Sequence, residues 1–486
     1  MLRNVRSKLG FLRPNPTPGL ARRLRVLRWQ VVAPLVAALA AGFGRLVCGW
    51  PLGLPSPPVR ARGDGVRIAY FHHAFPSLSE TFIQREILAL RSAGLPLAVF
   101  SLERPELEGL DASARALIAE TRYLTLEPLG RRSPALCRYL CRKPLVCTKL
   151  FFYTVWRQHT PRKSWATDWG LMARALVLAV AAEEWGATHL HSPWASPDAY
   201  VVLLASRLLG LPYSVHARAS DIHRHSSRPG LFERLNHAAF IVTNSEYNRE
   251  ILEKLLNGSS RPLPIVRIYN GLDPAEFTPV STPVPPDNRP LILAVGRLIE
   301  AKGFEHLLRA CALLKQQGRE FRCEIIGTAP ADAPNYRIRL LKLRRNLDLE
   351  ADVAFVGALP ADQVRARYGA ASLFVLPAVI AADGTGDVTP NVLLEAMATA
   401  RPVISTRSRA IPELVEDGES GLLVTPGDAD ALAEAMACVL DAPDLAARLG
   451  ANGRARVLAK FDIHRNIRPM LALFRGELDD PGIRRG

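Results

Sequence analysis

The chain has 486 residues, of which 48% are hydrophobic and 22% charged, so it has room for two to four domains and is too apolar to be disordered throughout. Its net charge of +16 is unevenly distributed: residues 1–62 carry 11 Arg and Lys, residues 131–163 carry nine, neither segment has an acid, and the remainder has net charge −4. This pattern indicates a local anionic surface, lipid or nucleic acid, and excludes a uniformly basic protein. Seven scattered cysteines without a CxxC pair argue against a disulfide framework and a structural zinc site.

Residues 1–65 form a basic leader. Its longest uncharged apolar run, Val31–Gly44, has 14 residues and is interrupted by Pro34, whereas a membrane-spanning helix needs about 20. Two interpretations stay open. The leader is either a poorly ordered basic segment or a membrane-interfacial anchor with Trp29 at its edge.

From Val66 to residue 277, short apolar runs alternate with stretches of helical periodicity. The predicted helix over Thr81–Gly94 repeats apolar residues at helical spacing and ends at a glycine. Strands are predicted at Val66–Phe71, Leu95–Leu102, Thr188–Pro193, Leu211–Ala217, Phe240–Ser245 and Pro264–Gly271. Strand–helix–strand repeats of this length predict a parallel sheet in a Rossmann-like domain over residues 66–277.

The basic segment 131–163 interrupts this alternation. Its Arg and Lys residues alternate with aliphatic and aromatic side chains, a mixture typical of helices that lie in a membrane interface. The alternative is a solvated helix whose apolar side packs into the core. The aromatic residues favour contact with an anionic membrane surface.

Five prolines in residues 278–290 indicate a stiff linker, and a second alternating series follows over residues 291–465. Its predicted strands are Leu291–Arg297, Phe321–Gly327, Val353–Gly357, Leu373–Pro377, Pro402–Thr406 and Gly421–Val424. Residues 466–486 are expected to form a tail or a final helix. The fold class is therefore α/β, with two Rossmann-like, doubly wound domains facing across a cleft, and ligands in such folds bind beyond the carboxyl ends of the strands.

The segment Gly384–Thr406 carries the strongest chemical signal. Thr389 and Pro390 read as the N-cap and first residue of a helix, and a helix start at the end of a strand can bind phosphate. Asp387 precedes the cap and Glu395 follows eight residues later, so two acids could hold different hydroxyls of one ligand. The alternative is a turn residue and a helix-surface acid.

A second constellation lies in Gly296–Leu308. Arg297 follows a predicted strand, and Lys302 lies five residues on, at the entrance to a helix. Two cations at this place suit a diphosphate. Taken alone, they could equally be surface cations on a loop.

Together these segments resemble glycosyltransferase family 4, retaining enzymes of GT-B fold, and in particular the exopolysaccharide and colanic-acid-type group. The resemblance spans residues 66 to about 465. The matching motifs are Phe75–Leu90, His189–Pro197, Ser214–Ile222, Thr243–Arg249, Ile268–Phe277, Gly296–Gly303, the acid–seven–Glu spacing and Ile411–Val424. The order of these motifs makes the resemblance specific, although each is weak alone.

The resemblance implies a role for each matching residue. Arg297 and Lys302 would neutralise the diphosphate of a sugar-nucleotide donor, and Glu395 would hold its ribose. Asp387 would hold the transferred sugar, which His216 would face from the other domain. The implied donor-binding residues are Gly296, Val388, Thr389, Asn391 and Glu395. The sugar nucleotide is a substrate, and neither a cofactor nor a metal is expected.

The expected function is therefore retaining transfer of a sugar to a glycan or lipid-linked acceptor in surface polysaccharide biosynthesis. We expect a cytoplasmic protein, peripheral on the inner face of the membrane. No motif supports nucleic-acid binding. Three residues depart from the family pattern: Asp387 stands for Glu, Val388 for Gly and Ala410 for Gly. Two alternatives stay open. One is a GT-B sugar-nucleotide epimerase, against which the acid–seven–Glu spacing argues, and the other is a catalytically silent nucleotide-binding scaffold protein, which Asp387 in place of Glu keeps open.

Overall fold

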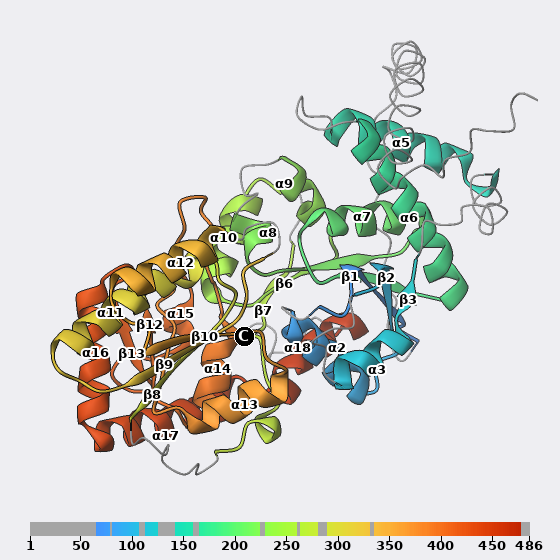
Figure 1. The fold of residues 1–486 in the computed structure, drawn as a ribbon. Coiled ribbons are helices and arrows are strands. Elements are labelled where there is room, and N and C mark those ends of the chain that lie inside the picture. The colour runs from blue at the N-terminus through green and yellow to red at the C-terminus, as the bar shows by residue number, and fades with distance from the viewer. Residues whose placement is uncertain are drawn as a thin grey trace, which may run out of the picture.

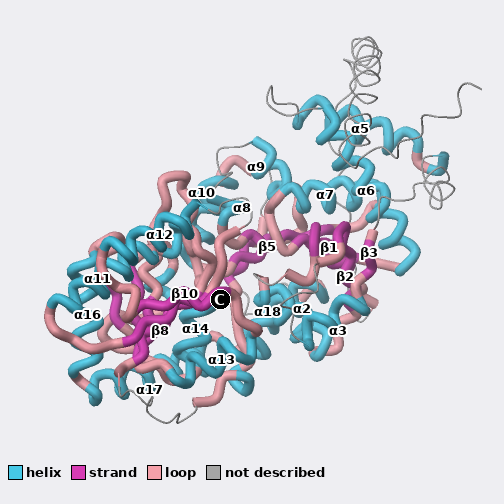
Figure 2. The backbone as a smooth tube through the Cα atoms, viewed as in Figure 1, coloured by secondary structure: helices cyan, strands magenta, loops and turns pink. Residues whose placement is uncertain are grey.

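A computed structural model describes residues 65–77, 80–105, 112–124, 141–158, 165–223, 229–259, 263–279, 289–330 and 335–477. The described chain forms two α/β domains, each built on one parallel sheet (Figure 1). Figure 2 shows the strands of both sheets in magenta between cyan helices. The predicted fold class is confirmed.

The N-terminal domain has a seven-stranded sheet in the order β3-β2-β1-β4-β5-β6-β7, and every neighbouring pair is parallel. Its strands are β1 (Ile68–Ala74), β2 (Leu97–Glu103), β3 (Arg122–Tyr123), β4 (His189–Ser192), β5 (Tyr213–Ala217), β6 (Ile241–Thr243) and β7 (Ile265–Arg267). The six strands expected from the sequence are confirmed. The two-residue β3 was not expected, because it is too short to give a periodic signal.

Helices cover both faces of this sheet. In one core, α5 (Pro144–Gln158), α6 (Trp165–Trp185) and α7 (Pro197–Leu209) pack against the strands. In a second core, α2 (Thr81–Ser92) and α3 (Ala112–Glu120) pack against the strands. The remaining helices are α8 (Ser220–His223), α9 (Pro229–Asn236) and α10 (Glu246–Leu256). Helix α2 ends where its sequence predicts, since Gly94 adopts φ +80°, a conformation that favours glycine.

The C-terminal domain has a six-stranded parallel sheet in the order β10-β9-β8-β11-β12-β13. Its strands are β8 (Leu291–Val295), β9 (Arg322–Ile326), β10 (Val353–Gly357), β11 (Leu373–Val375), β12 (Val403–Thr406) and β13 (Leu422–Val424). Its helices are α11 (Phe304–Gln316), α12 (Asn335–Asn346), α13 (Ala361–Ala370), α14 (Asn391–Ala398), α15 (Ile411–Leu414), α16 (Ala429–Asp441) and α17 (Pro443–Lys460), with a 3₁₀ turn, η2, at Glu300–Lys302. All six strands lie where the sequence predicts them.

The last helix, α18 (Ile463–Arg475), returns to the N-terminal domain. Its apolar residues Ile467, Met470 and Phe474 are buried in the same core as α2 and strand β1. Figure 1 shows this red helix beside the blue α2. Helix α18 therefore covers part of one face of the first sheet.

Only part of the basic segment 131–163 is described. In α5, Leu150 and Tyr153 are buried against α6 and α7, while Leu145 is 65% exposed and Lys149 is also exposed. One side of α5 thus packs into the core, as the alternative interpretation expected. The leader up to residue 64 lies outside the described residues. Within the described part of the chain, no helix is both long enough and apolar enough to cross a bilayer.

Candidate active site

The structure brings two of the predicted site residues into direct contact. Strand β8 ends at Val295, and the chain then runs through η2 to Lys302, whose Nζ lies 2.7 Å from Oδ2 of Asp387. Lys302 is only 9% exposed, so this ion pair is largely shielded from water. A buried amine needs a charged partner, and Asp387 supplies it.

Two glycines fix the path of the Lys302 side chain. A Cβ on Gly296 would lie 3.0 Å from Lys302 Cε, so a larger residue would push the side chain aside. Gly303 adopts φ +67°, and a Cβ there would lie 1.9 Å from the carbonyl oxygen of Pro377. Arg297, the other predicted cation, is exposed. The turn therefore places two cations after β8: Lys302, which is shielded from water, and Arg297, which is exposed.

The start of α14 differs from its predicted form. The expected cap by Thr389 is wrong: the helix begins at Asn391, Pro390 is the N-cap residue, and no side chain caps the helix. Thr389 Oγ1 instead accepts a hydrogen bond of 2.7 Å from Nδ2 of Asn244, in the N-terminal domain. Because the helix begins one residue later than expected, Thr389 lies before its N-cap, and the threonine hydroxyl makes this contact between domains instead. The neighbouring Val388 is 2% exposed.

Asn391, the first residue of α14, is also held from the N-terminal domain. Its Oδ1 accepts a hydrogen bond of 3.2 Å from Nδ2 of Asn270. The start of α14 and the ends of β6 and β7 thus meet at the domain junction, since Asn244 directly follows β6 and Asn270 lies shortly after β7. This is where the carboxyl ends of both sheets are expected to bind ligands.

Glu395 is already occupied on both carboxylate oxygens. Oε1 lies 2.8 Å from Nη2 of Arg85 on α2, and Oε2 accepts a hydrogen bond of 3.0 Å from the hydroxyl of Tyr368 on α13. Burial and the Glu395 carboxylate raise the pKa of Tyr368 well above its usual range, so this hydroxyl stays a donor. The guanidinium of Arg85 also lies 5.4 Å from the ring centre of Phe277.

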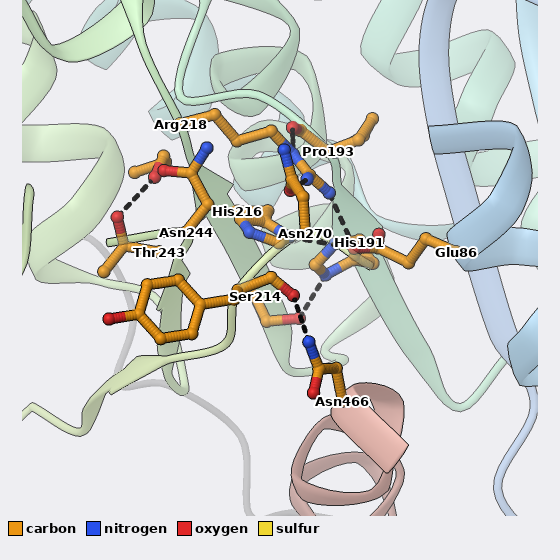
Figure 3. Close-up of polar contacts among 12 residues, drawn as sticks. Glu86, His191, Pro193, Ser214, His216, Arg218, Thr243, Asn244, Asn270 and Asn466 are labelled. Carbon is orange, nitrogen blue, oxygen red and sulfur yellow. Dashed lines mark hydrogen bonds and ion pairs between the residues drawn. The ribbon is translucent and has the colours of Figure 1, made fainter. Parts of the chain in front are cut away.

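His216 lies at the end of β5 in a buried polar cluster (Figure 3). Its Nδ1 is 3.2 Å from Oε2 of Glu86, and the same oxygen is 2.7 Å from Nη2 of Arg218. Burial and the Arg218 guanidinium lower the pKa of His216 to about 4, against a smaller opposing effect of Glu86, so the imidazole is neutral at pH 7. Burial alone would raise the pKa of Glu86, but Arg218 and His216 hold it below its ordinary value.

Glu86, His191 and His216 each bring one potential metal-ligating atom to within 4.8 Å of the others. Their surroundings disfavour a cation. The Arg218 guanidinium already pairs with Glu86, and it is only 1% exposed, so a metal ion would meet a buried positive charge. The cluster is better described as a balanced ion pair beside two neutral imidazoles, because burial also lowers the pKa of His191.

Sequence reasoning missed the residues that join the two domains. Besides Arg85, Asn244 and Asn270, Glu413 at α15 accepts hydrogen bonds of 2.8 Å from the backbone N–H groups of Glu246 and Tyr247, at the start of α10. Both asparagines are next to the last residue of a predicted strand, Phe240–Ser245 or Pro264–Gly271, and this place at the carboxyl end of a strand could have identified them as edge residues. Arg85 gave no signal, since it occupies one position among several polar ones on an ordinary amphipathic helix.

Comparison with known proteins gives a consistent family. Residues 281–456 match the family model described as Glycosyl transferases group 1. The chain is 30% identical to a protein of Salmonella typhimurium named as a colanic acid biosynthesis glycosyltransferase, WcaL, over 76% of this chain and 90% of the relative. It is 37% identical to the amylovoran biosynthesis glycosyltransferase AmsK of Erwinia amylovora, over 36% of this chain and 41% of the relative.

Solved structures show the same fold. Sucrose-phosphate synthase from Thermosynechococcus elongatus superposes with a TM-score of 0.64 at 21% identity, covering 85% of this chain and 99% of that one. HepE from Anabaena, solved in complex with UDP, gives a TM-score of 0.63 at 18% identity, covering 85% of this chain and 100% of that one. At these identities the likeness concerns the fold, which is the expected GT-B arrangement.

Proposed function

This chain belongs to the group 1 glycosyl transferases, and from that premise we propose that it transfers a sugar from a nucleotide-diphosphate donor to a glycan or lipid-linked acceptor. The names of its relatives in colanic acid and amylovoran biosynthesis support a role in surface polysaccharide assembly. One structural observation carries the proposal. The Lys302–Asp387 pair lies just before the start of α14, where Thr389 and Asn391 contact the N-terminal domain at the junction where the donor would lie.

In the proposed reaction, Arg297 and Lys302 neutralise the diphosphate, and Asp387 accepts hydrogen bonds from the hydroxyls of the transferred sugar. Glu395 accepts hydrogen bonds from the hydroxyls of the ribose. The donor site also includes Gly296, Val388, Thr389 and Asn391. Lys302 exchanges part of its contact with Asp387 for the phosphate as the leaving group gains charge. A preorganised hydrogen-bonding group of this kind, here the Lys302 amine, typically stabilises a transition state by about 3 kcal/mol.

We propose further that transfer retains the anomeric configuration. The acceptor attacks on the face that the nucleotide leaves, and a donor phosphate oxygen takes its proton, so no protein nucleophile is required. His216 is neutral at pH 7 and lies in the N-terminal domain, on the acceptor's side of the junction. Catalysis then depends on positioning and on charge stabilisation, and we propose that it needs no metal.

For its location, we propose a cytoplasmic protein that binds the inner face of the membrane peripherally through residues 1–65 and the basic segment 131–163. Exposed Arg142, just before α5, and exposed Lys149, on α5, support an electrostatic component. Flotation with liposomes tests this. Binding to anionic vesicles that weakens as salt rises supports it, because exposed charges are screened within about 8 Å at physiological ionic strength. Protein that floats with neither neutral nor anionic vesicles would refute it.

The proposed activity is tested in two steps. A panel of sugar nucleotides is first screened for thermal stabilisation, since a ligand at 100 times its Kd adds about 2.7 kcal/mol. The stabilising donor is then incubated with a lipid-linked or soluble glycan acceptor, and the product is analysed by mass spectrometry and NMR. A donor that is converted to its epimer, or bound without transfer, would favour the alternatives, which the comparisons do not support.

A further inference from the structure

Arg218 is a buried arginine whose contacts are directed to protein groups. It is 1% exposed, and its guanidinium donates from Nε to the carbonyl of Pro193 (3.2 Å), from Nη1 to Oδ1 of Asn270 (2.8 Å) and from Nη2 to Oε2 of Glu86 (2.7 Å). The planar fork of arginine can make such contacts simultaneously, whereas lysine cannot. Arg218 is therefore placed to orient other groups.

One end of this contact set orients His216. Oε2 of Glu86 is shared between Arg218, at 2.7 Å, and Nδ1 of His216, at 3.2 Å. Oε1 of Glu86 accepts a hydrogen bond from the hydroxyl of Tyr70. With both oxygens engaged, the carboxylate has a fixed position, 3.2 Å from Nδ1 of His216. Figure 3 shows Glu86, from α2, directed toward His216 and Arg218 at the end of β5.

The other end reaches the C-terminal domain. Asn270 accepts from Arg218 with Oδ1, so its amide is oriented with Nδ2 toward α14, where it donates to Oδ1 of Asn391 at 3.2 Å. A hydrogen-bonded path, which we call the Glu86–Asn391 relay, thus runs Glu86–Arg218–Asn270–Asn391 from the residue beside His216 to the proposed donor site. Buried hydrogen bonds in series strengthen and orient one another.

We propose that Arg218 and Asn270 are positioning residues that couple the contact between the two domains to the orientation of His216. When Asn391 of the C-terminal domain engages Asn270, the amide holds Arg218, Arg218 holds Glu86, and the imidazole is aligned toward the sugar. This inference rests on the proposed function, because it needs a donor at α14 and a sugar facing His216. Arg218 and Asn270 would then affect kcat although neither contacts the donor.

The test measures kcat and donor KM at saturating acceptor for Arg218→Lys, Asn270→Ala and the double variant. Arg218→Lys keeps the charge opposite Glu86 but cannot hold Asn270 and Pro193 as well. Each single variant is expected to lower kcat about tenfold, the effect of losing one charge-assisted hydrogen bond. Because both act through one relay, the double variant should lose about as much as either single one, whereas independent effects would multiply to about a hundredfold.

Asn466→Ala on α18 is the matched control. Its amide donates to the backbone carbonyls of Tyr269 (3.2 Å) and Lys460 (3.0 Å), also near the junction but outside the relay. It should retain the wild-type kcat. Coupling is supported if only the relay variants lose kcat and the double variant loses no more than either single one. A merely structural defect would also lower the thermal unfolding temperature, and it would not be limited to residues of the relay.

Two results would overturn the inference: wild-type kcat in Asn270→Ala, or fully multiplicative losses in the double variant. If Arg218→Lys does not fold, the comparison of Asn270→Ala with Asn466→Ala decides, because Asn270 lies outside the buried ion pair. A wild-type protein that transfers no sugar contradicts the proposed function instead, so the two failures are distinguishable.

Discussion

Arg85 and Glu395 are 310 residues apart in the chain, yet Nη2 of the arginine lies 2.8 Å from Oε1 of the glutamate across the domain junction. Both side chains are largely buried, with 17% and 13% of their surface exposed. Glu395 is the residue proposed to hold the donor ribose. The N-terminal domain therefore binds a group that the proposed donor would also contact.

Replacing Arg85 with methionine should tighten nucleotide binding. Without the guanidinium, Glu395 loses a competing donor, and a partly shielded ion pair of this kind is worth on the order of 1 kcal/mol, or about fivefold in Kd. Isothermal titration with UDP and GDP measures this. Arg365→Met is the control, since Arg365 also lies over Phe277 but pairs with Glu276 at 3.7 Å. Weaker binding in Arg85→Met would mean that the arginine contacts the donor itself.

Asp387 should behave as a working carboxylate although the family pattern has Glu there. Asp387→Asn removes the charge that balances Lys302 at 2.7 Å, and charge-assisted hydrogen bonds are roughly twice as strong as neutral ones. We expect turnover to fall at least about tenfold in Asp387→Asn, the equivalent of about 1.4 kcal/mol, and less in Asp387→Glu. Steady-state rates with one donor compare the three proteins. Full activity in Asp387→Asn would remove this residue from the site.

Gly303 should tolerate no side chain, in contrast to Gly318. Both glycines have positive φ, +67° and +74°, so Ala at either position carries a similar backbone cost of about 1 kcal/mol. At Gly303 the added Cβ would also lie 1.9 Å from Pro377 O, whereas at Gly318 nothing lies within 4 Å. Chemical denaturation should therefore show Gly303→Ala losing about 3 kcal/mol more than Gly318→Ala. Similar losses would show that the turn before α11 can shift.

The buried imidazole of His216 should make stability depend on pH. Its pKa is lowered from 6.5 to about 4 in the folded protein, so between these values the unfolded chain binds a proton that the folded chain does not. Stability from this residue is full above pH 6.5 and falls as pH decreases through that window, by about 2 kcal/mol at pH 5. Urea unfolding near pH 7.5 and pH 5 should show a smaller decrease in His216→Gln. Equal decreases in the two proteins would contradict a neutral buried His216.

Much of the fold was predictable because its signals are local. A central parallel strand is buried on both faces, so runs such as Leu291–Val295 are apolar throughout and recognisable in any context. The Lys302–Asp387 contact was foreseeable in part, since both residues follow strands whose carboxyl ends share one edge. The expected cap at Thr389 failed because a local propensity was overridden by a partner, Asn244, in the other domain.

The contacts between domains were not predictable from one sequence. Nothing in the periodicity of α2 distinguishes Arg85 from other polar residues on its face, because its partner Glu395 lies in another domain. Glu86 is a similar case. A glutamate within a helix reads as a solvated residue, and only the buried Arg218 opposite explains how it is stable at 6% exposure.

The return of α18 to the N-terminal domain bears on how the protein is made. Ile463, Ile467, Met470, Leu473 and Phe474 close the core over β1 and α2, although they are synthesised after the whole C-terminal domain. A nascent chain that has just emerged through residue 277 would therefore present an uncovered apolar sheet face. That face remains without α18 while almost 200 further residues are synthesised, at a rate of about 5–20 residues per second, and exposed apolar surface of this kind favours aggregation.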